Sequence, residues 1–187
     1  MRIISGTYGG RYLIGKIPPN VRPTTDYARE TMFDVLSSLI DIENKVFLDL
    51  FSGAGAIGLE SLSRGAAKVY FVDKSIESIN YLQKNIELLQ IPAEKYKIIK
   101  SDAIQFIMKF KITDNFDVIF ADPPYIENYC WRICQIISKN SLLNEEGLLI
   151  YESEKNKTEL IPDEFKIIKE KKFGNTKLYF IKLNYSK

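Results

Sequence analysis

The chain has 187 residues, 45% of them apolar, and a formal net charge of +2, which is the size and composition of one ordinary globular domain. It contains no histidine, which excludes Ser-His, Cys-His and His-metal catalysis and leaves proton transfer to carboxylates, lysine, tyrosine, backbone groups or water. No run of about 18 apolar residues occurs, and the first residues, MRIISGTYGG, lack the apolar stretch of a secretory signal. We therefore expect a cytoplasmic protein without a membrane-spanning segment.

The first 40 residues are predicted to form an extension in front of the main domain, which we place at residues 41–187. Arg2–Ser5 and Arg11–Ile14 flank a glycine-containing turn, which is typical of a hairpin. Thr24-Thr25-Asp26 then offers an N-cap to a helix. The apolar residues of this helix recur at helical spacing: Phe33, Leu36, Leu39 and Ile40.

Arginine is concentrated at the N-terminal end, whereas lysine carries most of the positive charge elsewhere. Four of the six arginines fall within the first 29 residues: Arg2, Arg11, Arg22 and Arg29. A guanidinium group makes planar, bidentate contacts with phosphate or guanine that an ammonium group does not make. The pattern favours contact with nucleic acid. The alternative is a salt-bridged surface in which Asp26 and Glu30 pair with these arginines.

From Val46 onward, apolar strand-like runs alternate with helical segments. The predicted strands are Val46–Leu50, Lys68–Val72, Lys97–Lys100, Asp117–Ala121 and Leu148–Glu152. The predicted helices are Ala56–Arg64, Ile76–Gln90, Ala103–Phe110 and Asn128–Ser138. Such alternation indicates an α/β fold, a mostly parallel sheet with helices on both faces. Cys130 and Cys134 lie four residues apart in the last helix, so we expect core residues and neither a disulfide nor a zinc site.

Two more strands are predicted at the C-terminal end, which brings the expected sheet to seven strands. Phe165–Lys171 and Lys177–Leu183 flank the turn sequence Phe173-Gly174-Asn175-Thr176. The expected result is an antiparallel pair that completes an otherwise parallel sheet.

A glycine-rich loop follows the first predicted strand in the sequence LDLFSGAGAIGLE. It contains Gly53-x-Gly55-x-x-Gly58, which allows a tight turn and close approach of a ligand to the positive end of a helix. Asp73 ends the next strand, where an acid typically accepts hydrogen bonds from both ribose hydroxyls. By itself this pattern also fits a nicotinamide dehydrogenase, or a loop that merely packs a helix on a strand.

Two further acids favour a ligand without phosphate. Asp49 precedes the loop, where it would repel a pyrophosphate but attract an amino or sulfonium group. Asp102, in Ser101-Asp102-Ala103, lies where it can accept a hydrogen bond from an adenine amine. Three carboxylates around a nucleoside indicate a cationic adenosine ligand, and S-adenosylmethionine is that ligand.

The sequence FADPPY places Asp122 at the end of a strand, followed by Pro123, Pro124 and Tyr125. Two prolines stiffen the loop, because each fixes its own backbone and restricts the preceding residue. The Asp122 carboxylate and the Pro123 carbonyl can accept hydrogen bonds from an exocyclic amine, and Tyr125 can stack on the target base. This arrangement suits methylation of an aromatic amine, and the alternative is an ordinary turn.

The segments LDLFSGAGAIGLE, FVDKS, SDA and FADPPY, in this order and spacing, resemble the Rossmann-like class I methyltransferases. The segments IISGTYGGR, RPTTDYARETMFDVL and YESE narrow the resemblance to the RsmD type of 16S ribosomal RNA (guanine-N(2))-methyltransferase, over nearly the whole chain. Nothing functional is implied for residues 154–172.

This resemblance implies methylation of a guanine 2-amino group in 16S ribosomal RNA, within a partly assembled small subunit and without a metal. The implied catalytic residues are Asp122, Pro123, Pro124 and Tyr125. The implied residues for S-adenosylmethionine are Asp49, Phe51, Ser52, Gly53, Gly55, Asp73, Lys74, Asp102 and Ala103. The implied RNA contacts are Arg11, Arg22, Thr24, Thr25 and Arg29, although both threonines serve equally well as helix caps.

Three other functions remain open from the sequence. DPPY also serves methylation of the adenine 6-amino group in DNA or RNA, although such enzymes commonly carry a separate target-recognition region. A nucleotide sensor or RNA chaperone with this fold would have no need of an intact Asp122-to-Tyr125 segment. A nicotinamide dehydrogenase would bind reduced dinucleotide.

Overall fold

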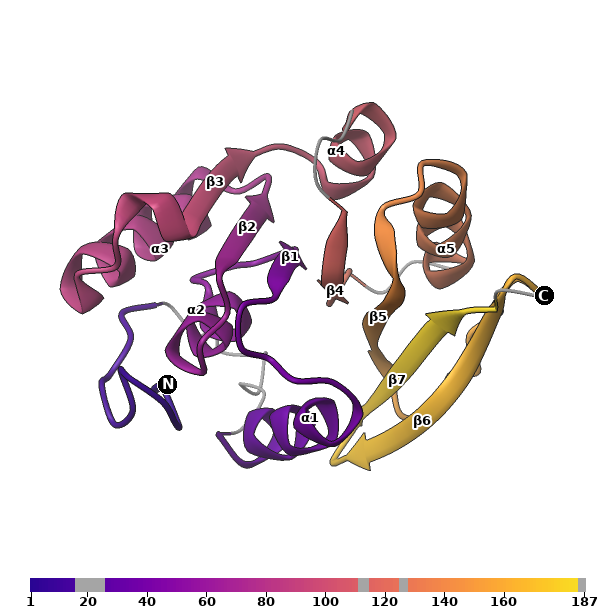
Figure 1. Ribbon diagram of the computed structural model, residues 1–187, viewed down its shortest axis with the longest axis horizontal. Coiled ribbons are helices and arrows are strands. Elements are labelled where there is room, and N and C mark those ends of the chain that lie inside the picture. Colours follow the sequence, from indigo (N-terminus) through magenta and orange to yellow (C-terminus); the bar gives the residue numbers. More distant parts are fainter. Residues whose placement is uncertain (16–25, 111–114, 125–127, 185–187) are drawn as a thin grey trace.

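A seven-stranded sheet with the order β3-β2-β1-β4-β5-β7-β6 forms the centre of the chain (Figure 1). The computed structural model describes residues 1–15, 26–110, 115–124 and 128–184. The strands are β1 (Val46–Leu50), β2 (Lys68–Asp73), β3 (Tyr96–Lys100), β4 (Phe116–Ala121), β5 (Leu143–Glu154), β6 (Phe165–Phe173) and β7 (Thr176–Leu183). The first five strands pair in parallel, and β7 pairs antiparallel with both β5 and β6. The predicted fold class is confirmed.

The helices cover both faces of the sheet. They are α1 (Asp26–Leu39), α2 (Ala56–Ser63), α3 (Ile76–Leu89), α4 (Ala103–Lys109) and α5 (Tyr129–Lys139), with a 3-10 turn, η1 (Ala93–Lys95), before β3. Side chains of α1, α2 and α3 share one hydrophobic cluster with one face of the sheet, and side chains of α4 and α5 share a second cluster with the other face. Buried Cys130 and Cys134 belong to the second cluster as free thiols, as predicted. Among the described helices, none is long and apolar enough to cross a membrane.

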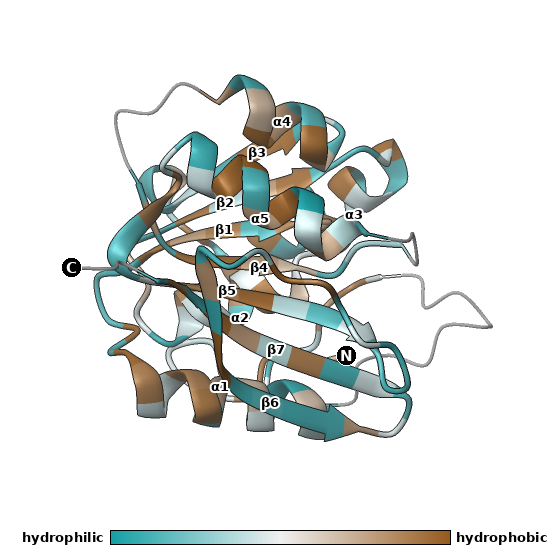
Figure 2. Cartoon of the chain, turned by 90° about the vertical axis from the view of Figure 1, so that its right-hand side faces the viewer, coloured by the Kyte–Doolittle hydropathy of each residue, from teal (hydrophilic) through white to brown (hydrophobic). Residues whose placement is uncertain are grey.

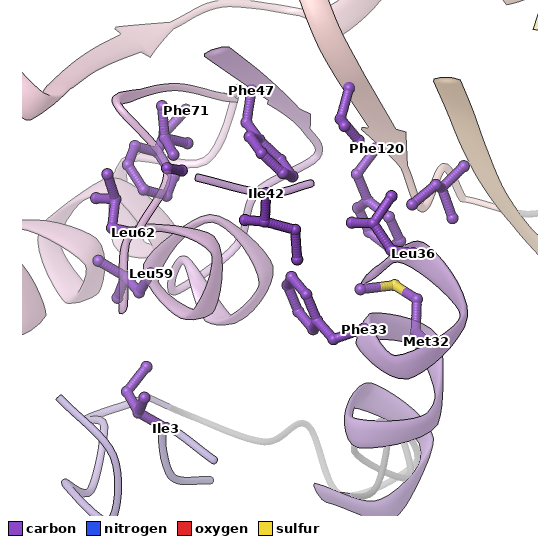
Figure 3. Close-up of a cluster of buried hydrophobic side chains, with 14 of the residues drawn as sticks. Ile3, Met32, Phe33, Leu36, Ile42, Phe47, Leu59, Leu62, Phe71 and Phe120 are labelled. Carbon is purple, nitrogen blue, oxygen red and sulfur yellow. The ribbon is translucent and has the colours of Figure 1, made fainter. Parts of the chain in front are cut away.

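The first cluster joins the N-terminal segment to the sheet. Phe33 and Leu36 point from α1 toward Phe47 of β1 and Phe120 of β4 (Figure 3). Ile3, from the first residues of the chain, is fully buried in the same cluster. Residues on both sides of position 40 therefore share one core. The division into an RNA-contacting extension (1–40) and a catalytic domain (41–187) stays a prediction.

The N-terminal hairpin is shorter than predicted. Backbone hydrogen bonds join Ile3 N to Arg11 O (2.9 Å) and Leu13 N to Met1 O (3.0 Å), and the two segments form one isolated antiparallel bridge, between Arg2 and Tyr12. The segment is held by α2, because the buried Glu60 carboxylate accepts hydrogen bonds from the backbone amides of Ile4 (2.7 Å) and Ser5 (3.1 Å). Backbone amides that bond to a side chain are not available for a strand ladder. The predicted hairpin therefore forms, but its pairing is limited to the residues around Arg2 and Tyr12.

The C-terminal hairpin has the predicted turn, with Gly174 in the left-handed conformation at φ 50°. Strand β6 forms the outer edge of the sheet, and Figure 2 shows it as largely hydrophilic beside the more hydrophobic β7. The pairing of β6 with β7 is irregular between Ile167 and Lys169. Strand β5 begins at Leu143, five residues earlier than predicted. The prediction missed this start because the polar residues Asn144–Glu146 interrupt the apolar pattern of the strand.

Candidate functional site

The candidate site lies where the order of the parallel strands reverses direction. Strand β1 has β2 on one side and β4 on the other, and the helices that follow β1 and β4 in the chain, α2 and α5, pack on opposite faces of the sheet. Such a switch point opens a crevice at the carboxyl ends of the strands, where α/β proteins bind ligands. The sequence-predicted acids all belong to this edge: Asp49 on β1, Asp73 at the end of β2, Asp102 after β3 and Asp122 after β4.

The glycine loop between β1 and α2 has the backbone that its sequence requires. Gly53 and Gly55 have positive φ angles, 55° and 88°, which L side chains rarely adopt. A Cβ at Gly58 would lie only 2.2 Å from the Phe71 ring, so this glycine allows α2 to pack closely on β2. Gly53 shapes the rim of the loop, and Gly58 serves the contact between helix and sheet.

The loop has features that fit an adenosine ligand. A Cβ at Gly53 would meet nothing within 4 Å, so the space above this residue is open to a ligand. The Ser52 hydroxyl is buried and has no hydrogen-bond partner among the described residues. Buried polar groups normally have a partner, so an unpaired hydroxyl beside an open glycine fits a site that a polar ligand completes.

Asp73 fixes the loop and keeps capacity for a ligand. Its Oδ2 accepts a hydrogen bond from Gly53 N at 2.8 Å, and its Oδ1 accepts one from Ser75 N at 2.8 Å. An ionised carboxylate has about four acceptor positions, so each oxygen can still accept a hydroxyl proton. The partly buried Asp73 therefore suits the predicted contact with a ribose, and Lys74 beside it is exposed.

Asp49 lies beneath the loop as a buried carboxyl group. Its pKa is raised to about 8, chiefly by burial and also by the Asp73 and Asp122 carboxylates, against the opposing effect of a hydrogen bond from Gly58 N (3.0 Å). A cation placed next to Asp49 would lower this pKa, because it stabilises the charged form. The predicted attraction of an amino or sulfonium group to Asp49 is consistent with this environment.

Asp102 and Ala103 begin α4 on the β3 side of the site. One carboxylate oxygen of Asp102 caps the helix by accepting a hydrogen bond from Gln105 N (3.0 Å), which leaves the other for a ligand. Ala103 is buried, and Phe51, at φ 64°, packs its ring 5.9 Å from that of Tyr129. A hollow of about 570 Å³ adjoins Asp102 between α4 and the start of α5.

Asp122 stands at the end of β4, next to the glycine loop in the order of strands. The residue keeps exposed surface, while the protein around its carboxyl group raises its pKa to about 6 through burial. Pro123 is buried and Pro124 is exposed. The fourth member of the motif, Tyr125, lies outside the described residues. The structure thus brings Asp122 and Pro123 to the same edge as Asp49 and Asp73.

Glu152 is a site residue that the sequence interpretation missed. It lies on β5 one position after Tyr151, the partner of Ala121, and is therefore the neighbour of Asp122 across the strands. The Glu152 pKa is raised to about 8, chiefly by burial and also by the Asp122 charge, while the Thr176 side chain, as a hydrogen-bond partner, opposes the rise. Its signal was available in the segment YESE, since an acid at the carboxyl end of a parallel strand faces the binding edge.

Asn85 is a second residue that was missed, because one asparagine among the polar residues of an amphipathic helix has no distinctive pattern. It is fully buried on α3. Its side chain accepts a hydrogen bond from Ile14 N (2.7 Å) and donates to Ile14 O (2.8 Å) and to Ala54 O (3.0 Å). Ala54 belongs to the glycine loop, so Asn85 connects this loop to the N-terminal segment.

The predicted RNA contacts divide into three groups. Arg29 does not fit the prediction, because its side chain is buried and donates to Asp26 Oδ1 (2.9 Å) and Arg2 O (2.6 Å). Arg2 also pairs with Asp26 at 3.2 Å, so the salt-bridge alternative applies to these two arginines. Arg11 is exposed, with its guanidinium 5.9 Å from the centre of the Tyr8 ring. The remaining candidates, Arg22, Thr24 and Thr25, lie outside the described residues.

Solved structures with at least 30% sequence identity share this arrangement over the whole chain. A putative methyltransferase from Escherichia coli, yhhF, superposes with a TM-score of 0.85 and 30% identity, covering 100% of this chain and 99% of its own. A putative methylase from Haemophilus influenzae superposes with a TM-score of 0.80 and 30% identity, covering 96% of each chain.

Sequence comparison gives the same group of relatives. The Haemophilus influenzae protein named ribosomal RNA small subunit methyltransferase D is 33% identical over 93% of this chain and 89% of its own length. The Escherichia coli protein of the same name is 33% identical over 93% of this chain and 85% of its own length. The family model described as "Conserved hypothetical protein 95" matches residues 1–182. The chain belongs to this family, which includes the ribosomal RNA small subunit methyltransferase D proteins.

Proposed function

We propose that this chain transfers a methyl group from S-adenosylmethionine to the exocyclic 2-amino group of a guanine in small-subunit ribosomal RNA. The relatives named ribosomal RNA small subunit methyltransferase D support the reaction class and the RNA. The observation that carries the proposal is the position of Asp122 and Pro123 at the switch point, beside the glycine loop and the acids Asp49 and Asp73.

The donor's fit rests on residues of three strands. In this proposal Asp73 accepts hydrogen bonds from the ribose hydroxyls, Asp102 accepts one from the adenine amine, and Asp49 faces the cationic methionine end; their free acceptor positions and the burial of Asp49 support these roles. When bound, S-adenosylmethionine supplies a methyl group whose bond to the sulfonium breaks as the amine nitrogen attacks. No residue has to become a nucleophile, which agrees with a chain that contains no histidine.

Asp122 and Pro123 act on the amine. The lone pair of an exocyclic amine is delocalised into the purine ring, which makes the nitrogen a poor nucleophile. Hydrogen bonds from the two N–H groups to the Asp122 carboxylate and the Pro123 carbonyl hold the nitrogen closer to tetrahedral. After transfer, one of these protons leaves to Asp122 or to water. Alignment of this kind supplies roughly 7–11 kcal/mol in well-oriented reactions.

RNA binding is assigned to the first segment of the chain. Exposed Arg11 is the described candidate for a phosphate contact, and Arg22, Thr24 and Thr25 are candidates from the sequence. An extension of this size is expected to recognise the shape and the phosphates of the RNA more than its base sequence. The family resemblance favours a partly assembled small subunit as the substrate.

The test is the identity of the methylated nucleoside. The chain is incubated with labelled S-adenosylmethionine and either small-subunit ribosomal RNA or small-subunit particles from cells that lack this gene, and the RNA is digested to nucleosides. We expect N2-methylguanosine, and fragment mass spectrometry then maps the position. N6-methyladenosine, or no labelled nucleoside with either substrate, would contradict the proposal.

Asp122→Ala should lower methyl transfer at least about 100-fold, since an orienting group that acts in the transition state is removed. Binding of S-adenosylmethionine, measured by calorimetry, should stay within about tenfold of the unmodified chain. Loss of cofactor binding with transfer intact would show that Asp122 holds the donor instead of the amine.

A further inference from the structure

Glu152 occupies a position that the proposed reaction does not yet use. Ala121 of β4 and Tyr151 of β5 are register partners, so Asp122 and Glu152 each follow one position later at the same edge. Neighbouring strands lie about 4.8 Å apart. The two carboxylates therefore face the same space, which is where the proposed function places the target base.

The Glu152 side chain has a polar neighbour on β7. It is partly buried, and the Thr176 side chain at the start of β7 acts as a hydrogen-bond partner that favours the charged form of Glu152. Among the described residues, Glu152 forms no ion pair. A partly buried carboxylate without a cation, held next to a second carboxylate, opposes folding. The stability of the fold therefore does not explain an acid at this position. A hydrogen-bond donor on the substrate would explain it.

The purine ring supplies such a donor. In guanine, the 2-amino group has the N1–H group as a neighbour, so two kinds of N–H donor lie side by side on one edge of the base. In adenine, the ring nitrogen next to the 6-amino group carries no proton and is an acceptor. Two neighbouring hydrogen-bond acceptors on the protein can therefore pair with the two donors of guanine, whereas in adenine one of them would face the unprotonated ring nitrogen.

We infer that Glu152 accepts a hydrogen bond from the N1–H group of the target guanine and thereby selects guanine, while Asp122 and the Pro123 carbonyl hold its 2-amino group. The inference rests on the proposed function and names the residue that sets its base specificity. Burial and Asp122 raise the Glu152 pKa to about 8, so below that pH the carboxyl group of the empty site is largely protonated; an N1–H donor stabilises its charged form and lowers this pKa.

The experiment compares three bases at the nucleotide that mapping has identified. The natural guanine is replaced by 2-aminopurine or by 2,6-diaminopurine in otherwise identical small-subunit RNA. Both analogues keep the 2-amino group and lack the proton on N1, and they differ from each other at position 6. The measured quantity is the ratio of kcat/KM for guanine to kcat/KM for each analogue.

The unmodified chain should prefer guanine over both analogues by about 10- to 100-fold, the value of one hydrogen bond to a charged group. Glu152→Gln should reduce both ratios to within about threefold of unity, because its amide can also donate to an unprotonated N1. Glu154→Gln changes an exposed carboxylate two residues later on the same strand and should keep the ratios of the unmodified chain. Calorimetry with S-adenosylmethionine confirms that each variant is folded.

The inference is overturned if Glu152→Gln keeps the preference for guanine, or if the unmodified chain uses the analogues as well as guanine. Either result would leave N2-methylguanosine as the product, so the proposed function would stand without this role for Glu152. A product of N6-methyladenosine would instead overturn the proposed function, and the role of Glu152 with it.

Discussion

At the scale of single residues, Asp73 combines a structural role with a binding role. Its two oxygens already accept hydrogen bonds from Gly53 N and Ser75 N, each at 2.8 Å. These contacts hold the carboxylate at the mouth of the glycine loop before any ligand arrives. A preoriented acceptor loses little conformational freedom when a ligand binds.

Asp73→Ala should therefore lower the affinity for S-adenosylmethionine by at least about tenfold, since a charge-assisted hydrogen bond contributes roughly 1.5–3 kcal/mol. Calorimetry measures the affinity, and Glu94→Ala removes an exposed carboxylate on η1 as a control. Binding to ribosomal RNA should not change. If RNA binding is lost and cofactor affinity is kept, Asp73 does not contact the ribose.

Arg29 and Glu152 show why residue roles are harder to predict than residue positions. Arg29 belongs to an arginine-rich segment that favours RNA contact, yet it is buried against Asp26. Glu152 stands in the segment YESE with one other acid, Glu154, and its register next to Asp122 distinguishes it. Burial and cross-strand neighbours are tertiary properties that a single sequence does not contain.

At the scale of elements, Asn85 makes the glycine loop and the N-terminal segment depend on each other. Its side chain bonds to Ile14 on one side and to Ala54 O on the other, and it is fully buried. Gly15 approaches the same loop, since a Cβ there would lie 3.2 Å from the Ala54 Cβ. The described N-terminal segment therefore rests directly on the loop that is proposed to hold the donor.

Asn85→Ala should weaken both the glycine loop and the N-terminal segment, because it leaves partly buried backbone groups of Ile14 and Ala54 without these partners, at a cost of about 1 kcal/mol or more. We expect faster hydrogen exchange in residues 1–15 and lower affinity for S-adenosylmethionine. Asn140→Ala removes a comparable hydrogen bond, 2.8 Å from Nδ2 to Ile107 O, far along the chain from this loop. If both variants change exchange in residues 1–15 equally, Asn85 has no special coupling role.

The elements themselves were largely predictable, and the exceptions have physical causes. β1 was predicted at its exact bounds because a short apolar run ends at a glycine loop. The acids of the site followed from that prediction, since parallel strands bring their carboxyl ends to one edge. The N-terminal hairpin is shorter than predicted because the buried Glu60 accepts hydrogen bonds from amides that a longer strand would have used. That competition depends on a helix more than 50 residues away in the chain.

At the scale of the whole molecule, the candidate site opposes the stability of the empty chain. Asp49, Asp73, Asp122 and Glu152 gather at one edge, and none of them forms an ion pair among the described residues. The pKa of Asp49 is about 8 in the folded chain against 3.8 for an ordinary aspartate. Between these two pH values the folded chain binds more protons than the unfolded chain, so this group lowers the free energy of unfolding as pH rises.

A cationic ligand should reverse this effect by stabilising ionised Asp49. Binding then releases a proton below pH 8, so the affinity for S-adenosylmethionine should rise by up to about tenfold for each pH unit between about 5.5 and about 7. Calorimetry at the two pH values measures the change, and thermal unfolding should show a larger Tm increase at the higher pH. Asp49→Asn should flatten the dependence; an equally steep dependence in this variant would place the proton on another group.

The hydrophilic outer strand has a consequence for how copies of the chain behave together. β6 leaves one side of its backbone unpaired within the described sheet, and it carries exposed Lys166, Lys169 and Lys172 together with the irregularity after Ile167. An open strand of this kind is a template for edge-to-edge aggregation unless charge and distortion oppose it. Two such strands meeting side by side would bring rows of ammonium groups together, so the lysines of β6 keep the molecules apart in concentrated solution.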